Sequence, residues 1–118
     1  MTGLDELEAF LFDKPGSNRE QPFGPEVLVF KVGGKIFALI AWEKQPLEIS
    51  LKCDPENAIF LRARFAGVRP GYHLNKKHWN SIILDGRIPT TDIKEMINES
   101  YDLVIQSLSK KLRDNLSA

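Results

Sequence analysis

Several features that mark secreted, membrane-bound or metal-binding proteins are scarce or absent in this sequence. It has one cysteine and two histidines, so no internal disulfide can form and Cys53 alone cannot hold a zinc ion. No apolar run approaches the roughly 18 residues of a membrane-spanning helix, and the N-terminus lacks the basic-then-apolar order of a signal peptide. These absences predict a protein of the reducing cytoplasm that neither crosses a membrane nor carries a metal.

Net charge is absent as well, because 16 basic residues balance 16 acidic ones. Attraction to nucleic acid must then come from a local patch. Acidic residues are missing between Arg62 and Trp79, and this basic stretch contains Arg62, Arg64, Arg69, His73, Lys76, Lys77 and His78.

What the sequence does contain is typical of a globular protein. Apolar residues make up 42% of the 118 positions and charged residues 27%, which is close to the average for soluble domains. A chain of this length can bury a single hydrophobic core without disulfides. We therefore expect residues 1–118 to form one domain.

The first part of the chain predicts a helix, an irregular connection and a β-hairpin. Leu4, Leu7 and Leu11 recur at helical spacing, with Thr2 as a possible N-cap. Residues 13–25 hold three prolines and two glycines, which favours an irregular connection. Branched and aromatic residues then occur on both sides of a Gly-Gly pair at 33 and 34, and such a pair is typical of a two-residue hairpin turn.

The predicted hairpin has two apolar faces. A two-residue turn pairs Val32 with Lys35 and Phe30 with Phe37. One face then carries Leu28, Phe30, Phe37 and Leu39, and the other carries Val29, Ala38 and Ile40. We expect helices to cover one face, and a loop or a second subunit to cover the other.

The second part of the chain predicts three more strands and two more helices. Residues 47–53 alternate between apolar and polar, which indicates a half-buried strand with Cys53 on its apolar face. Asp54 and Pro55 are suited to begin a helix over residues 55–65. Residues 67–75 form an edge strand or a bent one, and residues 79–84 form a better strand.

The longest helix is predicted near the C-terminus. Apolar residues recur there at spacings of three and four, after Pro89 and a capping threonine at position 90 or 91. They include Ile93, Ile97, Val104 and Leu108. The complete order α-β-β-β-α-β-β-α predicts an α+β fold, in which an antiparallel five-stranded sheet packs against helices.

Residues able to support catalysis are few. Cys53 can be a nucleophile or a small core residue, and its place in the alternating strand favours the core. His73 and His78 would point to opposite faces of a straight strand, with no third metal ligand nearby. Because no nucleophile, base and orienting residue can be assembled, we expect neither an enzyme nor a cofactor.

The basic stretch is the best candidate for a binding site. Its lysines and arginines can neutralise phosphates, and its aromatic rings can stack on exposed bases. The alternative is a solvated turn, with Tyr72 and Trp79 anchored in the core. The predicted nucleic-acid contacts within the stretch are Arg69, His73, Asn75, Lys76, Lys77, His78 and Trp79.

Most of the chain also resembles a known family. The matching segments are Lys14-Pro15-Gly16, Pro22-Phe23-Gly24-Pro25, residues 29–35 with Phe37-Ala38-Leu39, residues 51–55, residues 70–80, Leu84-Asp85-Gly86, Met96-Ile97 and Ser100-Tyr101. Through these segments the sequence resembles the MmcQ/YjbR family. The resemblance implies a CyaY-like or secretion-chaperone-like fold and DNA binding through two projecting hairpins, a double wing. It places Gly33, Gly34 and Lys35 at one tip and Asn75, Lys76 and Lys77 near the other.

Two functions therefore remain open. The first is DNA binding through the basic hairpin tips, with little sequence discrimination because phosphate contacts do not read bases. The second is a protein-interaction or chaperone-like module that binds a partner, or a second copy of itself, through the apolar face of the sheet.

Overall fold

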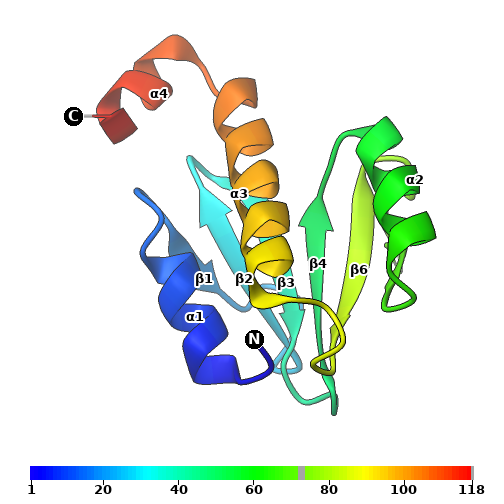
Figure 1. Cartoon of the computed structure of the whole chain (residues 1–118). Helices are drawn as coiled ribbons and strands as arrows, with labels where there is room; N and C mark the ends of the chain where they lie inside the picture. The colour runs from blue at the N-terminus through cyan, green and yellow to red at the C-terminus, as the bar shows by residue number, and fades with distance from the viewer. Residues whose placement is uncertain (72–73, 118) are drawn as a thin grey trace.

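The computed structural model describes residues 1–71 and 74–117, which form four helices and six strands around one core (Figure 1). The elements are α1 (Leu4–Phe12), β1 (Asn18–Glu20), β2 (Val27–Val32), β3 (Lys35–Ala41), β4 (Leu47–Lys52), α2 (Pro55–Arg64), β5 (Val68–Pro70), β6 (Trp79–Leu84), α3 (Thr90–Ser107) and α4 (Lys110–Ser117). No helix in the described ranges is both long and apolar enough to cross a membrane.

The strands form one antiparallel sheet in the order β1-β2-β3-β4-β6-β5. An α+β fold with an antiparallel sheet packed on helices is confirmed. The predicted count of five strands and the predicted element order are wrong, because β1 lies within the expected irregular connection and α4 follows the long helix.

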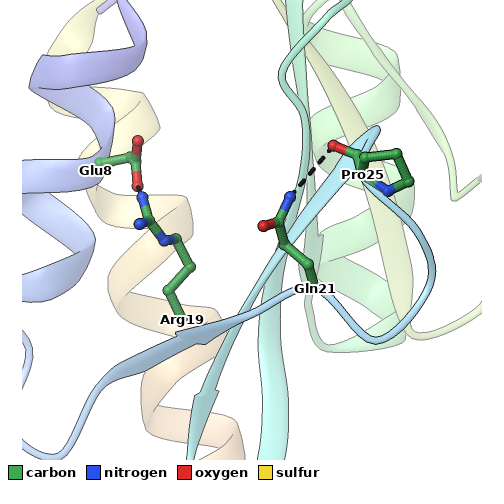
Figure 2. Close-up of polar contacts among 4 residues, drawn as sticks. All are labelled: Glu8, Arg19, Gln21 and Pro25. Carbon is green, nitrogen blue, oxygen red and sulfur yellow. Dashed lines mark hydrogen bonds and ion pairs between the residues drawn. The ribbon is translucent and has the colours of Figure 1, made fainter.

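Strand β1 leaves no pattern in the sequence because all three of its residues are exposed. It is held by backbone pairing with β2 and by side chains that form ion pairs with β2 and with α1. Glu20 forms an ion pair with Lys31 of β2, at 2.7 Å. Arg19 forms one with Glu8 of α1, as Figure 2 shows. Pairing and charge thus order a segment whose prolines and glycines suggested a loop.

Three helices cover one face of the sheet (Figure 1). Helix α3 crosses β2, β3 and β4, and helix α2 lies over β5 and β6. Helix α1 adds Leu7 and Leu11, both fully buried, to the same core. We call this the helix face, and the opposite side of the sheet the open face, since no helix of the described chain packs on it.

The hairpin of β2 and β3 departs from its predicted register through a β-bulge. Val32 pairs with Lys35 as predicted, but Phe30 pairs with Ala38, because Phe37 is the additional residue of the bulge. Phe37 is fully buried, with its ring 6.5 Å from that of Phe30 and 5.4 Å from that of Tyr101.

The bulge also changes which side chains share a face. The predicted faces were right for β2 but wrong for part of β3. The helix face carries Leu28, Phe30, Phe37, Ala38 and Ile40, whereas Val29 and Leu39 form a pair on the open face.

Helix boundaries agree with the predictions to within a residue or two, but two of the caps differ. Helix α2 begins after Asp54, whose carboxylate accepts a hydrogen bond from the Glu56 N–H at 3.2 Å, as predicted. The N-cap of α1 is Gly3 and not Thr2. Neither threonine caps α3: its N-cap is Pro89, and the Thr90 hydroxyl instead accepts a hydrogen bond from the N-terminal ammonium at 2.8 Å.

The Lys14-Pro15-Gly16 segment fastens the chain after α1 to helix α3. The Tyr101 hydroxyl donates to the Pro15 carbonyl, and the Lys14 ammonium donates to the Asn98 side chain. The same ammonium lies 4.8 Å from the centre of the Phe10 ring. These contacts give the segment a role in the fold.

Candidate binding groove on the open face of the sheet

One row of side chains crosses the open face from edge to edge. Residues that pair directly on neighbouring strands point to the same side of a sheet. The register of the strands therefore aligns one residue from each strand in the row Glu20, Val29, Leu39, Ser50, Ser81 and Arg69. The row begins with an acid on β1 and ends with a base on β5.

A groove of about 510 Å³ lies over the middle of this row. Its lining residues are Phe23, Val27, Leu39, Ala41, Lys44, Glu48, Ser50, Leu74 and Ser81. The strands β2, β3, β4 and β6 supply the floor. Phe23 and Leu74 belong to the connections before β2 and before β6, so two loops form the walls.

The floor is apolar on one side and carries hydroxyl groups on the other. Val27, Leu39 and Ala41 supply the aliphatic surface. Ser50 and Ser81 face each other across β4 and β6, with their hydroxyl oxygens 2.9 Å apart in a hydrogen bond. This combination suits an apolar ligand that also offers a few hydrogen-bonding groups.

An ion pair lies in the lining. The Lys44 ammonium is 2.8 Å from the Glu48 carboxylate, and the two side chains are 59% and 18% exposed. Because the pair neutralises itself, the lining has no net charge of its own.

The wall that carries Phe23 is held by one backbone carbonyl. The Pro25 carbonyl accepts hydrogen bonds from the Trp42 indole N–H at 2.7 Å and from the Gln21 side-chain amide at 3.2 Å. Figure 2 shows Gln21 reaching towards this carbonyl. Gly24 has a φ of 104°, which a residue with a side chain adopts only under strain. The result is a turn that leaves Phe23 61% exposed beside the groove.

The opposite wall continues into the predicted basic site. Asn75 organises this turn: its side-chain oxygen accepts from the Lys77 N–H at 2.9 Å, and its carbonyl accepts from the His78 N–H at 3.2 Å. The Arg62 guanidinium donates to the Lys76 carbonyl at 3.0 Å. Asn75, Lys76, Lys77 and His78 are all exposed on one turn next to the Leu74 wall.

The other predicted contacts are distributed around this turn. Arg69 is exposed on β5, opposite Ser81, and Trp79 is half-buried opposite Lys52. Lys35 lies at the same end of the sheet but is separated from the turn by β4. The predicted contact His73 lies outside the described residues.

Lys35 and the Gly33-Gly34 turn contact the end of α3. The Lys35 ammonium donates to the carbonyl and the hydroxyl of Ser107, at 3.2 and 3.1 Å. Gly33 has a φ of 59°, and a Cβ there would lie 2.7 Å from the side chain of Leu108. The tip that the family resemblance assigns to a wing thus docks on the C-terminus of α3.

Cys53 lies in the core, as its strand position predicted. It is 4% exposed, and Asn80 donates to its sulfur at 3.6 Å. Burial, with a smaller contribution from Glu99, raises the pKa of the Cys53 thiol to about 12. In the part of the chain that the structure describes, no group of three or more His, Cys, Asp and Glu side chains is arranged to hold a metal ion.

Comparisons with known proteins place the groove in a recurring domain. The sequence model of the YjbR family matches residues 12–103, a range that includes all the groove residues. YbdF of Escherichia coli O157:H7 is 41% identical over 90 residues, which are 76% of this chain and 74% of that protein. YjbR of Escherichia coli K12 is 32% identical over 110 residues, which are 93% of each protein. Both relatives are described as uncharacterized.

Solved structures show the same fold. Protein DR2400 of Deinococcus radiodurans, with a domain named DUF419, superposes with a TM-score of 0.93 at 40% identity, over 99% of this chain and 89% of that one. A crystal structure of a Pseudomonas syringae protein superposes with a TM-score of 0.73 at 26% identity, over 86% of this chain and 97% of that one.

Proposed function

Because the chain belongs to the YjbR family, and the region matched by that family contains the whole groove, we propose that it is a binding module that takes an apolar segment of a partner protein into this groove. The observation that carries the proposal is the hollow of about 510 Å³ on an apolar sheet face that no described helix covers. This volume lies within the usual range for ligand sites, about 300–1,000 Å³.

The energetics suit a reversible interaction. Each aliphatic side chain that a partner buries contributes about 1.5–3 kcal/mol. A partner that buries two or three such side chains gains about 3–9 kcal/mol, and the ordering of both partners offsets part of the gain. We therefore expect weak, reversible binding, with dissociation constants above about 1 μM, the value that corresponds to about −8 kcal/mol.

The face of the sheet is a better docking surface than its edges. The edge strands β1 and β5 have three residues each, and β5 ends at Pro70. Edges this short offer a partner strand few backbone hydrogen bonds. In the lining that the structure describes, the hydroxyls bond to each other and the charges pair, which favours binding over catalysis.

A peptide library tests the proposal. Random peptides displayed on phage are selected on the wild-type protein and then titrated against two arginine variants. Ala41→Arg places a long cation in the groove floor, whereas Ala9→Arg makes the same change on the exposed surface of α1. Melting curves establish that both variants fold.

The expected result is a set of apolar-rich peptides that bind the wild type and Ala9→Arg equally, and Ala41→Arg at least about tenfold more weakly, a difference of 1.4 kcal/mol or more. Failure to enrich any peptide, or equal binding to the folded Ala41→Arg variant, would overturn the proposal. A mass in gel filtration that doubles with concentration, and does so less in Ala41→Arg, would replace the partner by a second copy of this chain.

DNA binding through the basic turn is the second candidate. The supporting observation is that Arg69, Lys76 and Lys77 are exposed and take part in none of the salt bridges found among the described residues. With so few cations, such binding would be weak, would depend on salt and would discriminate little between sequences.

Fluorescence anisotropy with labelled single- and double-stranded DNA tests this candidate over a salt series. Lys76→Ala/Lys77→Ala removes two predicted phosphate contacts, and Lys110→Ala/Lys111→Ala is a matched control on α4. The candidate predicts that only the first variant lowers the salt slope, by about 0.7–0.9 per lost contact. Equal binding by the two folded variants would contradict it.

A further inference from the structure

We infer that the partner segment is amphipathic and carries acidic side chains along the edge that lies over β5 and β6. This inference rests on the proposed function and adds to it the chemistry and the orientation of the partner. It follows from the different charges on the two sides of the groove.

The side over β5 and β6 is basic. Arg69 lies directly opposite Ser81, a groove-lining residue, so their Cβ atoms are separated by about 4.5–5.5 Å. Lys52 lies on the same face, opposite Trp79. The exposed Lys76 and Lys77 follow the Leu74 wall. The sequence from Arg62 to Trp79 contains no acidic residue, and these four cations take part in none of the salt bridges found among the described residues.

The side over β1 and β2 is acidic or neutralised. Lys31 is paired with Glu20 at 2.7 Å, so its charge is already balanced. Glu26 is exposed next to the Phe23 wall, and its carboxylate oxygen lies 3.8 Å from the position of a Cβ on Gly24. Among the described residues, the cations near the groove that form none of the salt bridges found therefore lie on one side of it.

These charges select the partner and its orientation more than they strengthen binding. Ion pairs between exposed side chains each change a dissociation constant by up to about fivefold. The apolar floor supplies the affinity, and an acidic edge facing Arg69 fixes the direction in which the segment lies. A segment with a basic edge is repelled from β5 and β6.

The lining favours a polypeptide over nucleic acid as the acidic partner. The floor residues Val27, Leu39 and Ala41 offer methyl groups, and Phe23 in one wall is the single aromatic ring among the described lining residues, so successive bases have no row of rings on which to stack. Glu26, which is exposed beside the Phe23 wall and takes part in none of the salt bridges found among the described residues, repels a phosphate backbone. An acidic amphipathic peptide presents leucines to the floor and keeps its carboxylates at the basic edge.

Three synthetic peptides of equal length test the inference. They share one leucine-rich face and carry glutamate, glutamine or lysine along one edge. A labelled oligothymidylate of matched charge is the nucleic-acid probe in the same experiment. Binding is measured to the wild type, Arg69→Glu, Lys111→Glu and Ala41→Arg. Lys111→Glu makes the same charge change on exposed helix α4, away from the groove.

The expected result is that the glutamate peptide binds the wild type and Lys111→Glu about fivefold more tightly than the glutamine peptide, and the lysine peptide most weakly. In Arg69→Glu the advantage of the glutamate peptide over the lysine peptide shrinks, because Lys52, Lys76 and Lys77 remain, and Ala41→Arg weakens all three peptides. Equal binding of the three peptides, still weakened by Ala41→Arg, would overturn the acidic edge but keep the groove as the site. Peptide affinities that are the same in the wild type and Ala41→Arg would overturn both proposals. So would binding of the oligothymidylate without binding of any peptide.

Discussion

At the scale of single residues, several positions that carry the family resemblance have roles in packing. The Lys14-Pro15-Gly16 segment is tied to α3 by Tyr101 and Asn98. Gly33 brings its turn against Leu108. None of these contacts involves the groove, whereas Phe23 of the second proline-rich segment is exposed beside it. The residues that carry the resemblance thus divide between holding the fold and forming the proposed site.

The two glycines of the β2–β3 turn allow the cost of backbone strain to be measured apart from the cost of a steric clash. Both have positive φ, so alanine at either position costs about 1–2 kcal/mol. Only at Gly33 would the new methyl group meet Leu108, at 2.7 Å, while Gly34 has open space. We expect Gly33→Ala to lower the free energy of unfolding by about 1–3 kcal/mol more than Gly34→Ala, measured by urea denaturation. Equal losses would show that Leu108 does not restrict this turn.

The burial of Cys53 predicts how the free energy of unfolding depends on pH. Its pKa is raised from 9.0 to about 12 in the folded protein, so between these values the unfolded thiol ionises while the folded one stays protonated. Unfolding then releases a proton, and the contribution of Cys53 to stability, complete below pH 9, is lost as pH rises towards 12. We expect the free energy of unfolding to fall more steeply over this window in the wild type than in Cys53→Ala. Parallel curves would contradict a buried, protonated thiol.

At the scale of elements, the sequence predicted strongly patterned segments well. The alternation in β4 and the N-cap and proline of α2 each have a local physical cause, and both elements occur as expected. The bulge at Phe37 was missed because both faces of the hairpin are apolar, so a shift of one residue leaves no polar side chain in the core. Strand β1 was missed because its order comes from pairing and ion pairs with distant residues.

The connection between β1 and β2 controls how Phe23 is presented. Trp42→Phe removes the indole donor to the Pro25 carbonyl, which lies 2.7 Å away. The turn then loses order, and ordering it again on binding costs affinity. We expect about a three- to tenfold rise in the dissociation constant of a groove-binding peptide, and a loss of stability of about 1 kcal/mol. Gln21→Ala, which removes the longer of the two bonds, is expected to have a smaller effect. An unchanged affinity in Trp42→Phe would show that this wall does not contribute.

At the scale of the whole molecule, the sequence predicted that the hairpin is apolar on two sides and that a loop or a second subunit covers the second side, but not that two loops border a groove there. The groove needs a floor from four strands and walls from two loops, and these residues are far apart in the sequence. The alternation in β4 placed Ser50 on the polar side of its strand, but only the register of β4 and β6 brings it to Ser81. The basic turn was predicted from composition, whereas its position beside the groove depends on the sheet order.

The most direct test of the groove is a map of amide chemical shifts in ¹⁵N-labelled protein during titration with the glutamate-edged peptide. We predict that the shifts concentrate on Leu39, Ala41, Ser50, Leu74 and Ser81, while the amides of α1 and α3 stay unchanged. Shifts confined to residues 75–78, or located on the helix face, would contradict the central claim that this protein binds its partner through the open face of its sheet.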